Sequence, residues 1–319
     1  YDQTALQDLM AAHTLLFPEF ERQPEGVIPN YNPSARQDTA YTDQWGCVWR
    51  SPQDGITGTV VRHPLSDWEA FETYQAPDPD ETNGRLPLDW DAIRERFEEA
   101  SGPGRIRKGG LPHGHTFLLL TYIRGYENVI YDMADDEPRL RKLIAMVEEF
   151  NMGLVSRYLE CGANWMGYPE DLGMQSGPML SPDQFRKYIK PSYERLIKPA
   201  REAGCIIHMH SDGDIRDLVD DLVDGGVEAI NLQDLVHGIE WIRSRLAGKI
   251  CVDLDIDRQS ITRFGTPEQI DALIREEVAT LGDRQGGLML KFGLYPGTPL
   301  ENAAAVMDAM ERYAGYYSA

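Results

Sequence analysis

The chain has few cysteines and few basic residues, and both shortages restrict what it can be. The four cysteines are widely spaced and form no CxxC pair; they are Cys47, Cys161, Cys205 and Cys251. This spacing excludes a structural zinc knuckle and is typical of reduced thiols in a cytoplasmic protein. Only 31 Lys and Arg residues stand against 52 Asp and Glu residues, which gives a formal net charge of −21. Because such a chain repels phosphate backbones and anionic lipid surfaces, we predict binding to neither nucleic acids nor membranes.

Long apolar runs are also missing. No stretch approaches the roughly 18–20 uninterrupted apolar residues of a membrane span, and no cleavable leader is visible. The chain begins at Tyr1 rather than Met, which leaves room for native residues missing from this end. With 319 residues, of which 42% are hydrophobic, it is long enough for one α/β barrel or two ordinary domains.

The chain changes character near residue 105. Residues 1–104 are rich in proline, aromatic and acidic residues, with short strand signals at GCVW and GTVVRH and one helix at DWDAIRERFEEA. Beyond this point apolar strands alternate with amphipathic helices. We predict a single domain over residues 1–319, in which residues 1–104 form an irregular part with a lid or hairpin and residues 105–319 form regular β/α units.

The alternating pattern of residues 105–319 predicts an eight-stranded (β/α)8 barrel. Strands that alternate with helices favour parallel pairing and right-handed crossovers. The helices that follow Ser181, Thr266 and Thr298 each begin with a capping box and a proline. An open doubly wound sheet is the alternative, but no glycine-rich phosphate fingerprint follows any strand. The predicted strands are 116–122, 163–171, 205–210, 228–233, 250–256 and 287–295.

Two histidines end the predicted strand CIIHMH. His208 and His210 share one face, because successive side chains of a strand point to opposite sides. In a barrel this face is the lumen, and the C-terminal end of a strand is where barrel active sites are built. Neutral imidazoles in this arrangement can reach a common ion about 2 Å from each nitrogen, which favours zinc. The alternative is one hydrogen-bonded core histidine beside an incidental one.

Carboxylates and aromatics at other strand ends are candidates for the rest of a site. Carboxylates there suit a metal or an acid/base site, although turn and helix caps are the plainer alternative. The candidate acids are Glu170, Asp171, Asp212 and Asp253. Candidate substrate contacts are Tyr122, Trp165, Tyr168, Gln233 and Tyr295, although core packing also explains the aromatics. His113 and His115 precede a predicted strand, so we expect them on the opposite, stability face.

The segment HMHSDGDIRDLVDDLVDGGVEAINLQD resembles the uroporphyrinogen decarboxylase superfamily, and in particular its corrinoid-linked methyltransferase branch. TDQWGCVWRSPQDG, IRGYENVIYDM, EDLGMQSGPMLSPDQF and GLYPGTPLENAAAVMDAM match in the same order. The resemblance extends from about residue 40 to the end of the chain. It implies a distorted (β/α)8 barrel with its site at the C-terminal mouth and a first strand preceding the helix TALQDLMAAHTLLF.

The chain departs from the family pattern at informative positions. The RQAGRY segment that clamps substrate carboxylates in the tetrapyrrole decarboxylases is missing, which disfavours that reaction. Thiol-methylating members hold zinc with His-x-Cys and a later Cys, whereas this chain has His210 and Phe292 at those places. Imidazole in place of thiolate leaves a more electrophilic ion, suited to polarising an oxygen substituent. The resemblance therefore implies a zinc-assisted methyltransferase that takes methyl from a small, O-methylated substrate.

The hypothesis assigns roles to the candidate residues. A zinc ion on His208 and His210 polarises the leaving atom, and one of the four candidate acids stabilises or protonates it. The methyl group passes to cobalamin carried by a separate corrinoid protein. A cytoplasmic chain of this kind is also compatible with a homodimer. The alternatives are a uroporphyrinogen decarboxylase-like lyase, a metal-dependent barrel hydrolase and a non-enzymatic barrel that binds a ligand.

Overall fold

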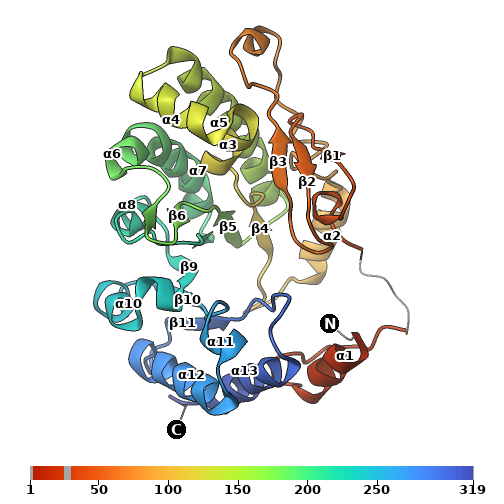
Figure 1. Cartoon of the computed structure of the whole chain (residues 1–319), viewed down its shortest axis with the longest axis vertical. Helices are drawn as coiled ribbons and strands as arrows, with labels where there is room; N and C mark the ends of the chain where they lie inside the picture. The colour runs from red at the N-terminus through yellow and green to blue at the C-terminus, as the bar shows by residue number, and fades with distance from the viewer. Residues whose placement is uncertain (1–2, 25–29, 319) are drawn as a thin grey trace. The chain divides into compact units, whose positions relative to one another are not determined.

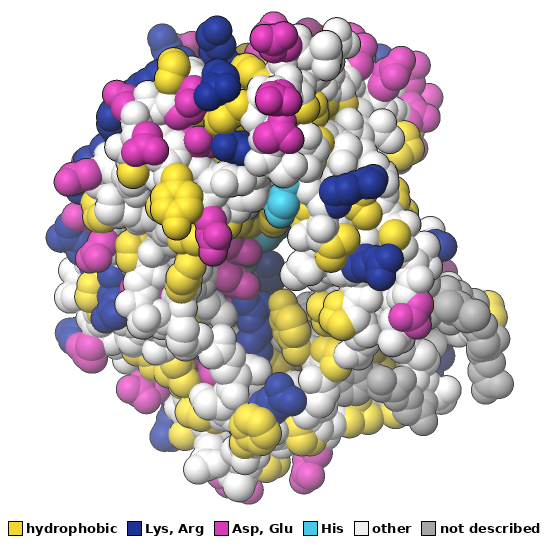
Figure 2. Space-filling model, turned by 45° about the horizontal axis from the view of Figure 1, so that its top comes forward, with side chains coloured by type: hydrophobic (Ala, Val, Ile, Leu, Met, Phe, Trp, Pro, Cys, Tyr) yellow, Lys and Arg dark blue, Asp and Glu magenta, His cyan; other side chains and the backbone are white. Residues whose placement is uncertain are grey.

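The computed structural model of the protein describes residues 3–24 and 30–318 and has an α/β fold (Figure 1). Its residues divide into two compact units, one of Asn30–Glu228 and the other of Ala229–Ala319 with Tyr1–Pro29. On the face drawn in Figure 2, acidic and basic side chains are interspersed without a continuous basic patch. This distribution agrees with the excess of carboxylates in the sequence.

Three parallel strands form the centre of the unit Asn30–Glu228. They lie in the order β4-β5-β8, so β5 pairs with both neighbours. In this register Gly167 lies opposite His208, and Pro169 lies opposite His210. A short antiparallel pair, β6 with β7, follows β5. The bounds are β4 Lys108–Gly110, β5 Trp165–Pro169, β6 Gly173–Met174, β7 Gly177–Pro178 and β8 Ile206–His210.

Helices of the same unit connect these strands. The longest described helix is α5, with 23 residues, which buries an apolar face that includes Leu140, Leu143 and Val147 at helical spacing. Among the described helices, none combines the length and the apolar character that a bilayer crossing requires. The helices are α2 Trp90–Glu99, α3 Phe117–Arg124, α4 Tyr126–Ala134, α5 Pro138–Glu160, α6 Pro182–Gln184, α7 Lys190–Glu202 and α8 Val219–Asp224, with a π turn at Phe185–Ile189 between α6 and α7.

The first part of this unit contains a small antiparallel sheet, as the short strand signals predict. Its order is β1-β2-β3, and its bounds are Tyr41–Thr42, Val48–Arg50 and Thr59–Arg62. Trp49 of β2 is 2% exposed, and its indole nitrogen donates to Oδ2 of Asp43 at 2.7 Å. A buried tryptophan with a satisfied N–H anchors the sheet to the body of the unit.

The second unit has its own three parallel strands. Strand β10 pairs with β9 on one side and β11 on the other. In this unit α12 begins with the predicted capping box of Thr266 and Gln269. Nδ1 of His13, in the N-terminal segment, lies 3.2 Å from Oε2 of Glu311. The elements are α1 Gln3–Ala12, β9 Ala229–Gln233, α9 Asp234–His237, α10 Ile239–Arg245, β10 Cys251–Asp255, α11 Ile261–Phe264, α12 Pro267–Leu281, β11 Leu288–Lys291 and α13 Leu300–Tyr313.

Two local predictions are wrong. The run 116–122 lies in helix α3 and its N-cap rather than in a strand, because it is buried nearly all round and so has no periodicity to distinguish the two. The strand in this region is β4, which the sequence does not announce because two of its three residues are glycine. The predicted capping box at Thr298 does not form either: α13 begins at Leu300, and Pro299 is its N-cap without a side-chain hydrogen bond.

Candidate active site

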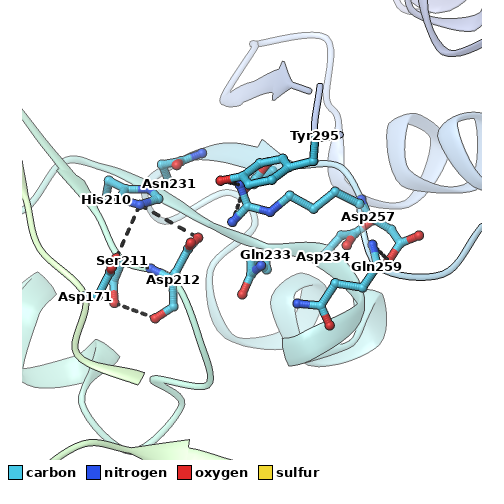
Figure 3. Close-up of polar contacts among 12 residues, drawn as sticks. Asp171, His210, Ser211, Asp212, Asn231, Gln233, Asp234, Asp257, Gln259 and Tyr295 are labelled. Atoms are coloured by element: carbon cyan, nitrogen blue, oxygen red, sulfur yellow. Dashed lines mark hydrogen bonds and ion pairs between the residues drawn. The ribbon is translucent and has the colours of Figure 1, made fainter. Parts of the chain in front are cut away.

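Two histidines and a carboxylate converge at the C-terminal ends of β4, β5 and β8. Oδ1 of Asp171, just after β5, lies 3.2 Å from Nε2 of His113 and 3.5 Å from Nε2 of His210. The backbone N–H of Asp212 donates to the same oxygen at 3.0 Å. Figure 3 shows His210 pointing toward both Asp171 and Asp212. We call His113, Asp171 and His210 the His-Asp-His group.

The His-Asp-His group is open to solvent on one side. The side chain of His113 is 42% exposed, that of Asp171 is 27% exposed and that of His210 is 16% exposed. Burial acts to raise the pKa of Asp171, but hydrogen bonds from both imidazoles and from the Asp212 backbone hold this pKa well below its usual range. Asp171 is therefore a carboxylate at neutral pH and presents negative charge to a cation.

Two of the three ligand separations in the His-Asp-His group match those of a tetrahedral zinc site. One ligand atom from each residue lies within 4.8 Å of the other two. Bonds of about 2.0–2.1 Å in a tetrahedral zinc site separate the ligand atoms by about 3.3–3.4 Å. The observed separations of 3.2 and 3.5 Å from Asp171 bracket this value. A carboxylate oxygen of Asp212 lies 3.7 Å from Nε2 of His210 and is within reach of the same position.

A tight crossing of two loops fixes the carboxylates of this site. The N–H of Gly173 donates to the carbonyl of Asp212 at 3.2 Å, and the N–H of Asp214 donates to the carbonyl of Met174 at 2.7 Å. A Cβ added to Gly213, whose φ is +76°, would lie 2.2 Å from the carbonyl carbon of Gly173. A Cβ added to Gly173 would lie 2.5 Å from the N atom of Asp214. The loops after β5 and β8 therefore meet backbone to backbone.

Glu170, the predicted acid next to Asp171, points the other way. It is fully buried and accepts backbone N–H groups of Thr116, Phe117 and Leu118 at 2.8–3.0 Å. The hydroxyl of Tyr193 donates to it at 2.8 Å. Burial raises the pKa of Glu170, while these hydrogen bonds act against the rise. The side chain caps the N-terminus of α3 and holds β5 against this helix.

The expectation that His113 lies on the stability face is wrong. Because residues 117–124 form α3, His113 follows β4 and sits at the C-terminal end of that strand, beside Asp171. His115 is fully buried, and burial lowers its pKa to about 3. Its Nδ1 lies 2.6 Å from Oγ1 of Thr116. His115 thus belongs to the neutral core, whereas His113 belongs to the site.

His208 lies outside the His-Asp-His group. Its ring packs against the indole of Trp165, with ring centroids 5.2 Å apart. Residues two apart on a strand are separated by about 6.6 Å, so His208 lies one layer below His210. Tyr168 points to the opposite face of β5, where it is 1% exposed and donates its hydroxyl to the carbonyl of Leu196 at 3.0 Å. This placement matches the core-packing alternative for Tyr168.

Tyr122 lies on α3 of the first unit, and the second unit holds Asp253, Gln233 and Tyr295. Asp253 lies on β10 beside Asn231, whose amide donates to the Asp253 carbonyl at 2.6 Å. Gln233 ends β9, and its carbonyl lies 2.7 Å from Nδ1 of His237. The hydroxyl of Tyr295 accepts from Arg258 at 3.2 Å, and the guanidinium of Arg258 lies 4.8 Å from the Tyr295 ring centroid. Figure 3 labels Asn231, Gln233 and Tyr295.

The fold and the comparisons define the class of protein. The α/β fold of the (β/α)8 barrel class, predicted above, is confirmed by a methyltransferase from Methanosarcina mazei, whose solved structure matches with a TM-score of 0.66 at 19% identity over 98% of this chain and 86% of that one. The model of the uroporphyrinogen decarboxylase (URO-D) family matches residues 44–313, so the chain belongs to this family. It is an enzyme of the URO-D superfamily, as the sequence motifs predict.

Relatives in this superfamily carry two different activities in their names. A uroporphyrinogen decarboxylase of Thermus thermophilus is 26% identical over 275 residues, which cover 81% of this chain and 72% of the relative. The methylcobamide:CoM methyltransferase MtaA of Methanosarcina barkeri is 26% identical over 161 residues, which cover 49% of this chain and 43% of the relative. The predicted resemblance to a superfamily that includes corrinoid methyltransferases is confirmed.

Proposed function

We propose that this protein is a corrinoid-dependent methyltransferase that demethylates a small O-methylated substrate. The observation that carries the proposal is the His-Asp-His group at the C-terminal ends of three parallel strands. A site without thiolates suits an oxygen leaving group better than a sulfur nucleophile. The likeness to MtaA and to the M. mazei methyltransferase supports methyl transfer within the family.

The chain's own side chains supply binding and proton handling in this proposal. His113, Asp171 and His210 would hold a zinc ion, which when bound supplies a Lewis acid for the ether oxygen. Asp212, whose carboxylate lies 3.7 Å from His210, is placed to hold a proton for the leaving oxygen. The reduced corrinoid of a partner protein would accept the methyl carbon as the C–O bond breaks, and the leaving oxygen would take the proton held by Asp212.

Other predicted residues keep supporting roles in the proposal. Trp165 and His208 provide an aromatic floor one layer below His210, since their rings pack against each other. Glu170 binds backbone N–H groups at the start of α3, which holds the end of β5 against this helix and so orients the adjacent Asp171. Asp253, Gln233, Tyr168 and Tyr295 remain predicted site residues, and the assignment of the substrate to the O-methyl class remains part of the proposal.

Methyl transfer to free cobalamin tests the function directly. Reduced cobalamin is mixed with the protein and a panel of methoxylated aromatics, methoxylated aliphatic acids and methylated amines, and formation of methylcobalamin is followed by its absorption spectrum. We expect methylation from at least one O-methyl donor, its loss after chelation, and loss in His210→Ala. Arg94→Gln, an exposed change on α2, serves as the control. Hydrolysis of the donor without methylcobalamin would replace the proposal with a metal-dependent hydrolase.

Decarboxylation is the second candidate, because the relatives that cover most of this chain are uroporphyrinogen decarboxylases. The acidic chain, with a net charge of −21, repels a substrate with many carboxylates. Incubation with uroporphyrinogen, followed by chromatography of the oxidised porphyrins, separates the two candidates. We expect no loss of carboxyl groups; catalytic turnover to a less carboxylated porphyrinogen would overturn the methyltransferase proposal.

A further inference from the structure

One arginine beside the His-Asp-His group packs against two aromatic rings. The guanidinium carbon of Arg85 lies 4.7 Å from the ring centroid of Trp49 and 5.5 Å from that of Tyr122. Its Nη2 donates to the carbonyl of His113 at 3.0 Å. Stacking on two rings and a bond to the backbone fix the plane and position of the guanidinium group. Arg85 is therefore anchored to the same residue that contributes an imidazole to the group.

The charge of Arg85 has no carboxylate partner among residues 3–24 and 30–318. Other arginines of this acidic chain are paired at short distance, as Arg124 is with Asp132 at 2.9 Å and Arg157 with Asp80 at 2.6 Å. For Arg85 no described carboxylate lies within ion-pair distance. The nearby Asp43 uses its oxygens for the N–H of Cys47 and the indole of Trp49. Arg85 thus has no direct ion pair with a described carboxylate, although its charge acts to lower the pKa of the nearby Asp43.

Tyr122 connects Arg85 to the site. Burial raises the pKa of its phenol to about 12, the positive charge of Arg85 acts to lower this pKa, and the charges of Glu170 and Asp171 raise it. The phenol therefore stays a neutral hydrogen-bond donor, and it lies close enough to sense both carboxylates and the guanidinium. Arg85 and Tyr122 together place a cation and a neutral hydrogen-bond donor side by side.

We propose that Arg85, supported by Trp49 and Tyr122, binds the carboxylate of the substrate, so that the substrate is a small methylated carboxylic acid. This inference rests on the proposed function, because it names the substrate class of the same site. An arginine has five N–H donors; one bonds the His113 carbonyl and another approaches the Tyr122 hydroxyl, so three remain for a carboxylate. The single positive charge of Arg85 matches a monoanion, whereas a phosphate dianion would need further cations.

Binding of matched ligands to the whole protein tests this assignment without turnover. Calorimetry compares 4-methoxybenzoate with 4-methoxybenzamide, and methoxyacetate with methoxyacetamide, since each pair has nearly the same shape and differs in charge. We expect the wild-type protein to bind at least one acid more tightly than its amide. Arg85→Gln should weaken binding of the acid by about ten- to a hundredfold and leave the amide unchanged, as expected for loss of a charge-assisted hydrogen bond.

Two further variants keep the test decisive. Arg85→Lys retains the charge but not the planar fork, so its affinity for the acid should fall between those of the wild type and Arg85→Gln, and it decides the question where Arg85→Gln fails to fold. Arg94→Gln removes an exposed positive charge on α2 and should bind as the wild type does. Equal binding of acid and amide by the wild type, or an unchanged preference in Arg85→Gln and Arg85→Lys, would overturn the assignment.

The inference and the proposed function fail in different ways. Selective binding of the acid that depends on Arg85, with no methyl transfer to cobalamin from any donor, would leave the carboxylate site standing and remove the methyltransferase proposal. If the protein transfers methyl groups but kcat/KM for acid donors is the same in the wild type and in Arg85→Gln, the methyltransferase proposal stands and the carboxylate site is removed. With both functions intact, the KM for acid donors should rise in Arg85→Gln.

Discussion

Nε2 of His113 lies 3.2 Å from Oδ1 of Asp171, although 58 residues separate them in the chain. The contact exists because β4 pairs with β5 in parallel and both strands end at the same edge. His210 reaches the same oxygen from β8, the next strand of the sheet. A metal site at this edge therefore needs only one residue from each of three neighbouring strand ends.

We predict that His113→Ala removes bound zinc as effectively as His210→Ala does. The protein purified without added metal should contain about one zinc per chain, measured by elemental analysis after gel filtration. Asp171→Asn should weaken zinc binding strongly, because an amide is a poor ligand for this ion. His208→Ala is the matched variant, since it removes an imidazole from the same strand but outside the His-Asp-His group.

The metal prediction separates two ligand assignments. Retention of zinc in His208→Ala and its loss in His113→Ala supports the His-Asp-His group. The opposite pattern would support the pair His208 and His210 that the sequence indicates. Zinc content that is unchanged in both variants contradicts a site at this edge of the sheet.

We predict that Glu170→Gln is strongly destabilising. The neutral side chain cannot keep three backbone N–H groups of α3 and the Tyr193 hydroxyl on its oxygens, and the lost charge-assisted bonds should lower the free energy of unfolding by about 2–4 kcal/mol. Urea denaturation followed by fluorescence measures this change. Glu137→Gln, which alters a more exposed cap that accepts one backbone N–H and pairs with Arg139, should cost much less. Equal costs in the two variants would contradict the assigned role of Glu170.

We predict that Glu277→Gln stabilises the second unit at neutral and higher pH. Burial and the neighbouring charges of Asp234 and Asp257 raise the pKa of Glu277 to about 11, so the folded protein keeps this carboxyl protonated while the unfolded chain ionises it. The stability is therefore fully present below about pH 4.5 and falls as the pH rises toward the folded pKa. Glutamine does not titrate and removes this loss.

The effect of Glu277→Gln should depend on pH in one direction. Unfolding free energies from urea denaturation should match those of the wild type near pH 4.5 and exceed them by about 1–3 kcal/mol at pH 8. Glu276→Gln is the comparison variant: it changes the exposed neighbour on the same helix, whose charge adds only weakly to the rise in the pKa of Glu277, so its effect should be much smaller. A difference that shrinks from pH 4.5 to pH 8 would contradict the raised pKa.

The regular part of the fold follows from local patterns. The capping box at Thr266 and the apolar spacing of α5 are set by nearest neighbours, so the sequence predicts both. Strand β4 cannot be predicted from the sequence, because its two glycines have low strand propensity and are required only by close packing against neighbouring side chains. A Cβ on Gly109 would lie 2.8 Å from the sulfur of Met166, a contact that only the tertiary structure creates. Because the glycine-rich strand β4 cannot be predicted, the sequence places the strand of this region at α3 instead.

The sequence predicts only those residues of the candidate site that follow strands with a clear apolar pattern. Asp171, His210 and Asp212 follow strands with clear apolar patterns, so their common edge could be predicted. His113 follows strand β4, which the sequence does not reveal, so the sequence places this histidine at the wrong end of the sheet. Arg85 lies in the irregular part of the chain, where no periodicity relates a residue to the sheet. Its contact with the His113 carbonyl is visible only in three dimensions.

The crossing of Gly173 and Gly213 has a practical consequence for engineering new substrate ranges. Any randomised library over the loops after β5 and β8 should leave both positions fixed, because each glycine excludes a side chain on the other and no single partner change restores the space. Gly177, which has open space around a missing Cβ, does not face this steric limit, although its φ of +158° still disfavours a side chain. Diversity is therefore better placed at the exposed Gln175 and Ser176, where the site can be reshaped without moving Asp171.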